Sequence, residues 1–179
     1  MKAAAKNYRV WVLLPALILG FFSQSTSGFC HSDSDVKLMD KFQKKFLEHY
    51  KAFTYIAKAS RGQELEYEIA IDFINLCESY ADNTDFISEE LIIAEMVENK
   101  IDRQMVGKIL QRRIQREIQA VEKFTTGEIN NNLAHSKNAA VVAEGNKLKD
   151  DLKAFQEALQ AIVDSMAKSG KDSAHQKNE

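Results

Sequence analysis

The position of the single proline constrains the fold of this chain more than any other feature of its sequence. Pro15 lies near the N-terminus, so the sequence from residue 16 to residue 179 lacks the residue that most strongly interrupts a helix. The chain also contains only seven glycines. A β-sandwich or an α/β enzyme of this length normally needs more turn-forming residues than that. The sequence therefore predicts an all-α fold.

The N-terminal segment has the layout of a secretory signal peptide. Lys2, Lys6 and Arg9 form a positively charged region, and an apolar run follows at 10–22. The small and polar residues after it suit cleavage behind Gly28 or one residue earlier. At about 1.5 Å per residue, the apolar run is too short to cross a hydrocarbon layer of about 30 Å as a helix. We therefore expect a cleaved signal peptide and no stable membrane span after cleavage, and the alternative is an uncleaved N-terminal anchor.

This segment sets the expected domain organisation and location. We expect a signal peptide at 1–28, one helical bundle domain at 29–168 and a disordered tail at 169–179. A cleaved signal peptide places the mature protein outside the cytoplasm, either in a periplasm or in the extracellular space.

Apolar residues recur at spacings of three and four along the rest of the chain, which is the period of an amphipathic helix. Gly62 fits the left-handed position after a helix, the polar stretch 81–87 is typical of a loop, and Thr125 with Glu128 resembles a capping box. The stretch 130–145 is poor in large apolar residues, so we expect a bend or fraying there. The helices predicted from these signals lie at about 36–59, 63–80, 88–124 and 128–168.

These elements predict an antiparallel helical bundle with packing like that of a coiled coil. It has four helices, or three long rods if the first two are continuous through Gly62. A heptad-like seam should pack against the preceding helix, and its alternative partner is a second copy of the chain in a homodimer. The seam residues are Leu148, Leu152, Phe155, Leu159, Ile162 and Met166.

Two cysteines and one histidine are candidate site residues near the mature N-terminus. In an oxidising compartment Cys30 and Cys77 could form a disulfide, although Cys77 could equally be a small buried residue. If cleavage follows Gly28, His31 becomes the third residue of the mature chain. A free α-amine, two backbone amides and this imidazole could form a square-planar Cu(II) or Ni(II) site, and the alternative is a solvated arm.

A basic segment is a candidate surface for an anionic partner. Lys108, Arg112 and Arg116 share a helix face, and Arg113 lies beside them. The alternative is an ordinary solvated face on which Arg113 pairs with Glu117. The aromatic residues of the first helix could likewise line a cavity for an apolar ligand, or simply form the core.

Functional motifs are absent, and the charge is nearly balanced, with 24 basic and 26 acidic residues. That balance argues against a nucleic-acid binder, and no catalytic, cofactor or metal-binding motif occurs. We therefore expect a non-catalytic protein without a cofactor that binds a protein partner, as an adaptor, effector or chaperone. The alternatives are a carrier of a small apolar ligand or a cytokine-like signal. The layout is loosely similar to secreted helical cytokines and to helical chaperones and adaptors of bacterial envelopes.

Overall fold

A computed structural model describes the backbone of residues 33–175 and the side chains of residues 33–99 and 101–168. The described part contains helices and no strand, which confirms the predicted all-α bundle. Its elements are α2 (Asp33–Ala59), α3 (Glu64–Met96), α4 (Lys100–Lys123), the wide π-helical turn η1 (Phe124–Glu128), α5 (Ile129–His135) and α6 (Ala139–His175). The predicted signal peptide, Cys30 and His31 lie outside the described residues. None of the described helices is both long enough and apolar enough to cross a membrane.

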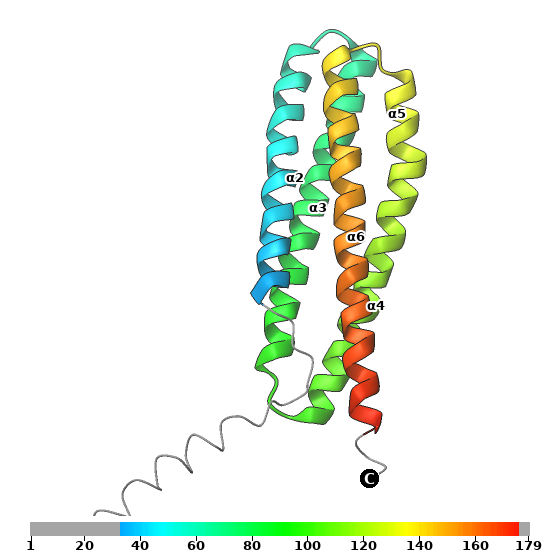
Figure 1. Ribbon diagram of the computed structural model, residues 1–179. Helices are drawn as coiled ribbons and strands as arrows, with labels where there is room; N and C mark the ends of the chain where they lie inside the picture. The colour runs from blue at the N-terminus through cyan, green and yellow to red at the C-terminus, as the bar shows by residue number, and fades with distance from the viewer. Residues whose placement is uncertain (1–32, 176–179) are drawn as a thin grey trace, which may run out of the picture.

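The helices form four antiparallel rods, in which α4, η1 and α5 follow one another as a single rod (Figure 1). The chain therefore adopts the four-helix form of the predicted bundle and not the three-rod form. The turn between α2 and α3 has Gly62 at φ 100°. Only glycine adopts this backbone conformation readily, so Gly62 allows the chain to reverse within a few residues.

The predicted loop at 81–87 is wrong, because α3 continues through it to Met96. Ala81, Thr84 and Ile87 are buried at helical spacing, and the Thr84 hydroxyl donates to the carbonyls of Tyr80 and Ala81. Core packing on one side of the helix thus outweighs the weak helix propensity of the polar residues between these positions. The chain turns instead at 97–99, where the Asn99 side chain accepts a hydrogen bond from the Ile101 amide at 2.9 Å.

The predicted helix start at Thr125 is also wrong. The Thr125 and Thr126 hydroxyls donate to carbonyls of the preceding turn, at 2.8 and 2.7 Å, instead of capping a new helix. The break comes at 136–138, where the Asn138 side chain accepts from the Ala140 amide at 2.9 Å. This break falls inside the stretch 130–145, where the sequence predicts a bend or fraying.

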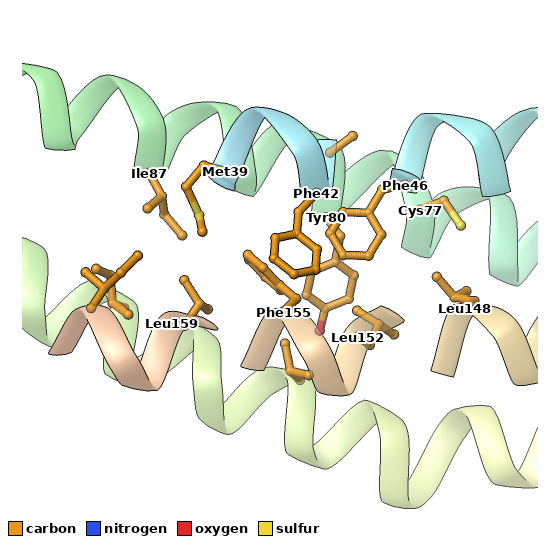
Figure 2. Packing of buried hydrophobic residues seen from close by; sticks show 14 of the residues in the cluster. Met39, Phe42, Phe46, Cys77, Tyr80, Ile87, Leu148, Leu152, Phe155 and Leu159 are labelled. Carbon is orange, nitrogen blue, oxygen red and sulfur yellow. The ribbon is translucent and has the colours of Figure 1, made fainter. Parts of the chain in front are cut away.

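The heptad-like seam of α6 is buried within the single chain, so its predicted intramolecular packing is confirmed. Its residues have exposures of 0 to 2%. Phe155 lies near the centre of the core, with ring centroids 5.3 Å from Phe42 and 5.5 Å from Phe46 (Figure 2). Phe42 and Phe46 of α2 thus pack against α6 and against each other, whereas Phe53 stacks on Phe73 of α3.

Hydrogen bonds close the end of the bundle where the α2–α3 and α5–α6 connections meet. The Glu66 carboxylate is buried and accepts from the Ser136 hydroxyl at 2.5 Å and from the Lys137 amide at 2.6 Å. The Ser136 hydrogen bond outweighs burial and lowers the pKa of Glu66. Asn138 also donates to the Ser60 hydroxyl, at 3.2 Å. Both connections at this end are therefore tied to each other.

Candidate functional site

The opposite end of the bundle carries a concentration of exposed apolar side chains. It lies around the turn at 97–99, where α3 ends and α4 begins (Figure 1). Six large apolar side chains here have exposures between 43 and 76%. We call this set the apolar corner, and its residues are Ile92, Ile93, Met96, Ile101, Met105 and Ile109. Single exposed apolar residues are normal, whereas a cluster of this kind is typical of interaction surfaces.

The apolar corner continues directly into the predicted basic segment. Successive residues of an α-helix are turned by about 100°, which places Ile101, Met105 and Ile109 on one face of α4. The same geometry places three exposed basic residues on this face, namely Lys108, Arg112 and Arg116. The solvent-facing side of α4 therefore combines apolar groups in its first half with positive charges further along.

Arg113 does not belong to this surface. Its guanidinium lies 3.6 Å from the centroid of the Phe86 ring, and it donates to the Glu90 carboxylate at 2.9 Å. Both partners are on α3, so Arg113 joins α3 to α4. The pairing of Arg113 with Glu117 that the sequence suggests is therefore wrong. Glu117 instead accepts a hydrogen bond from Asn83 at 3.0 Å.

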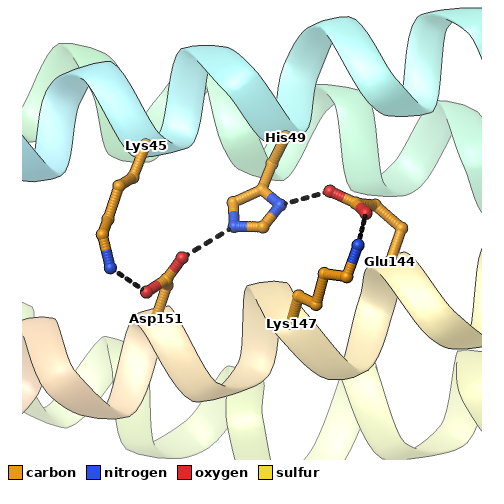
Figure 3. Close-up of polar contacts among 5 residues, drawn as sticks. All are labelled: Lys45, His49, Glu144, Lys147 and Asp151. Atoms are coloured by element: carbon orange, nitrogen blue, oxygen red, sulfur yellow. Dashed lines mark hydrogen bonds and ion pairs between the residues drawn. The ribbon is translucent and has the colours of Figure 1, made fainter.

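A polar network connects α2 to α6 along the side of the bundle (Figure 3). The imidazole of His49 is buried and lies between two carboxylates, with Nδ1 2.7 Å from Glu144 and Nε2 3.0 Å from Asp151. Two lysines contact the outer oxygens of these carboxylates. We call this network the α2–α6 bridge, and its residues are Lys45, His49, Glu144, Lys147 and Asp151.

The α2–α6 bridge joins the two helices through contacts at both nitrogens of the His49 imidazole. An imidazole with a carboxylate oxygen at each nitrogen satisfies both contacts only when both nitrogens carry protons. It then has no lone pair free for a substrate or a metal ion. Burial raises the pKa of Asp151, but the hydrogen bonds from Lys45 and His49 outweigh that effect and hold the pKa below its ordinary value.

The remaining candidate residues are dispersed over the structure. Cys77 is fully buried in the core, where burial raises the pKa of its thiol and disfavours the reactive thiolate. His135 is exposed on α5, with Nδ1 2.8 Å from the Asn131 carbonyl. Among the described side chains, those of residues 33–99 and 101–168, no three acidic, histidine or cysteine groups lie so that they could hold a metal ion.

Sequence reasoning missed the partners of His49 and the apolar corner. Lys45 and His49 are one turn apart on α2, and Glu144 and Asp151 are one heptad apart on α6, so matching polar stripes were the available signal. The apolar corner was missed because the sequence predicts one continuous helix at 88–124, without the turn at 97–99. Comparison of the chain with known protein families, with curated proteins and with solved structures gave no match.

Proposed function

We propose that this chain is an extracytoplasmic, non-catalytic helical-bundle protein that acts by binding another protein through its apolar corner. The observation that carries the proposal is the clustering of exposed isoleucine and methionine side chains at one end of an otherwise well-packed bundle. Leaving such groups in water forgoes about 25 cal/mol for each Å² of apolar surface that a partner could cover. Methionine adapts easily to differently shaped apolar surfaces, so Met96 and Met105 suit this role.

The charge next to the apolar corner indicates the chemistry of the partner. Lys108, Arg112 and Arg116 extend the solvent-facing side of α4 away from the apolar residues. A partner that matches both halves has an apolar stripe flanked by aspartate or glutamate, as an acidic amphipathic helix does. The extracytoplasmic location rests on the signal-peptide layout of residues 1–28.

The core packing favours binding at the surface over carriage of an apolar ligand inside the bundle. Phe42, Phe46 and Phe155 contact one another at the centre of the molecule, where a carrier would need open space. An apolar carrier therefore remains the less supported alternative.

Site-specific photo-crosslinking in the producing organism tests this proposal. A photoreactive phenylalanine replaces Met105 in one variant and Tyr55 in the control, because Tyr55 is similarly exposed but lies on α2. We expect one protein to be crosslinked from position 105 and not from position 55. The purified partner should bind the unmodified chain, and Met105→Asp should weaken that binding at least tenfold.

A charge-reversal variant and the crosslinked mass complete the test. Arg112→Glu/Arg116→Glu should weaken binding of the same partner, and added salt should weaken the binding of the unmodified chain. Crosslinking only to a second copy of the chain would replace the proposal with self-association. Equal crosslinking from positions 105 and 55 would contradict a specific surface at the apolar corner.

A further inference from the structure

A pocket lies between α3 and the rod formed by α4 and η1, on a part of the bundle distinct from the apolar corner. Its volume is about 330 Å³, within the range of small-molecule sites. Asp72 and Asn83 line it from α3, Glu117 lines it from α4, and Phe124 and Glu128 line it from η1. We call it the acidic pocket, because its described lining residues include three carboxylates and neither lysine nor arginine.

Glu117 is half-buried, whereas the other two carboxylates of the pocket, Asp72 and Glu128, are exposed. Burial raises its pKa, and this effect outweighs the hydrogen bond from Asn83 and the more distant positive charge of Arg113. Arg113 itself is held by Glu90 and by the Phe86 ring. Among the described residues Glu117 forms no ion pair, and a positively charged ligand would supply one.

Tyr80 is a second polar group of this pocket, and it gives evidence independent of the carboxylates. Its side chain is 2% exposed and lines the pocket, and its hydroxyl has no hydrogen-bond partner in the described structure. Figure 2 shows the ring crossing the interior, with the hydroxyl at the end away from α3. Burial and the negative charges of Glu117 and Glu128 raise the pKa of Tyr80, so the hydroxyl stays protonated. A buried hydroxyl without a partner is costly unless a ligand satisfies it.

We propose that the acidic pocket binds a small organic ammonium ion. Its ammonium group would contact the Glu117 carboxylate and the Tyr80 hydroxyl oxygen, and the face of the Phe124 ring would pack against its cationic end. Phe124 already lies next to Tyr80, with ring centroids 6.3 Å apart in an edge-to-face arrangement. Since the carboxylates are spread along the pocket, an elongated cation suits their spacing better than a metal ion does.

Titration with 1,4-diaminobutane tests the proposal, with 1,4-butanediol as its uncharged counterpart. Binding is followed by calorimetry and by NMR shifts of the Tyr80 and Phe124 rings, using the full mature chain at neutral pH. We expect binding of the diamine and none of the diol at the same concentrations. Glu117→Gln should weaken binding at least tenfold, and Tyr80→Phe should weaken it several-fold.

Two controls keep the outcome interpretable. Glu122→Gln removes an exposed carboxylate of α4 that does not line the pocket, and it should leave the affinity unchanged. Circular dichroism should show that Glu117→Gln and Tyr80→Phe remain folded, because each change removes a group that is poorly satisfied in the free protein. Equal binding of the diol, or equal weakening by Glu122→Gln, would overturn the proposal. The photo-crosslinking result is independent of either outcome, because the apolar corner and the pocket share no residue.

Discussion

The α2–α6 bridge and the acidic pocket both place charged groups inside the same bundle, but they differ in how those charges are balanced. In the bridge, each carboxylate contacts the His49 imidazole and one lysine. In the acidic pocket, Glu117 accepts a hydrogen bond from one neutral amide, and the Tyr80 hydroxyl has no hydrogen-bond partner within the described part of the chain. A carboxylate therefore stabilises the interface between α2 and α6, whereas the charged carboxylate of Glu117 destabilises the interface between α3 and α4.

The pKa shifts express this difference with opposite signs. The pKa of Asp151 is lowered, because its hydrogen-bonded partners favour the charged form more than burial disfavours it. The pKa of Glu117 is raised, because burial dominates. A polar network in which each charge is paired is typical of a structural element. A carboxylate whose pKa is raised by burial is more typical of a binding or catalytic site.

Replacing His49 should have the largest effect on the stability of the α2–α6 bridge. In His49→Leu the carboxylates of Glu144 and Asp151 lose the group between them, and the exposed fractions of these side chains are only 16 and 24%. We expect a loss of about 2–4 kcal/mol in the free energy of unfolding, measured by urea denaturation at pH 7. His135→Leu, at an exposed histidine, is the matched control and should change stability by less than about 0.5 kcal/mol. Similar effects of the two substitutions would show that the bridge contributes little.

Asp151→Asn should destabilise the protein less, by about 1–2 kcal/mol at neutral pH, since the amide keeps the volume but loses the charge. The pKa of Asp151 is lower in the folded state than in the unfolded chain. Its contribution is therefore fully present above the ordinary aspartate pKa and is lost as the pH falls through the lowered value. Urea denaturation between pH 7 and pH 3 should show the difference between variant and parent shrinking with acid. A constant difference would contradict this linkage.

Glu117→Gln should have the opposite sign. The pKa of Glu117 is higher in the folded state, so the parent loses stability as the pH rises from the ordinary glutamate pKa through the raised value. The uncharged variant escapes this loss and should be more stable than the parent at pH 7, by less than about 1 kcal/mol. Thermal denaturation at pH 4 and pH 7 should show the advantage only at the higher pH. A destabilised variant at pH 7 would indicate that Glu117 has a countercharge after all.

The smallest effect is expected for Lys147→Ala. Lys147 contacts Glu144 at 3.2 Å, but its side chain is 69% exposed, and exposed pairs contribute about 0–1 kcal/mol. We expect a change below about 0.5 kcal/mol in urea denaturation, which added salt should reduce further. A loss as large as that of His49→Leu would mean that the bridge is held by its outer lysine and not by the imidazole.

The sequence predicted the architecture better than the boundaries of the helices. The seam from Leu148 to Met166 and the turn at Gly62 were readable, because apolar spacing and glycine conformation are local signals. The connections after α3 and α5 were misplaced, because 81–87 and Thr125 have local features of loops and caps. At both places buried side chains hold the helix together, and those contacts come from other parts of the chain.

The α2–α6 bridge and the acidic pocket were less predictable than the fold. The pairing of His49 with Glu144 and Asp151 depends on how α2 and α6 are rotated and shifted relative to each other. The pocket depends similarly on the meeting of α3 with η1. Periodicity gives the buried side of each helix but not its register against a helix far away in the sequence.

The up-and-down order of the four rods also has a consequence for how quickly the protein folds. α2 packs on α3, α3 on α4 and α4 on α6, so most interfaces join neighbours in the sequence. Folding rates rise when contacts are local, so we expect the bundle to form in microseconds to milliseconds. The interface between α2 and α6 joins the first and the last rod in the sequence, so its formation requires closure of the longest stretch of chain. We therefore expect the contacts of His49 with Glu144 and Asp151 to form late, after the other helix pairs have formed. His49→Leu should then accelerate unfolding with little change in the folding rate.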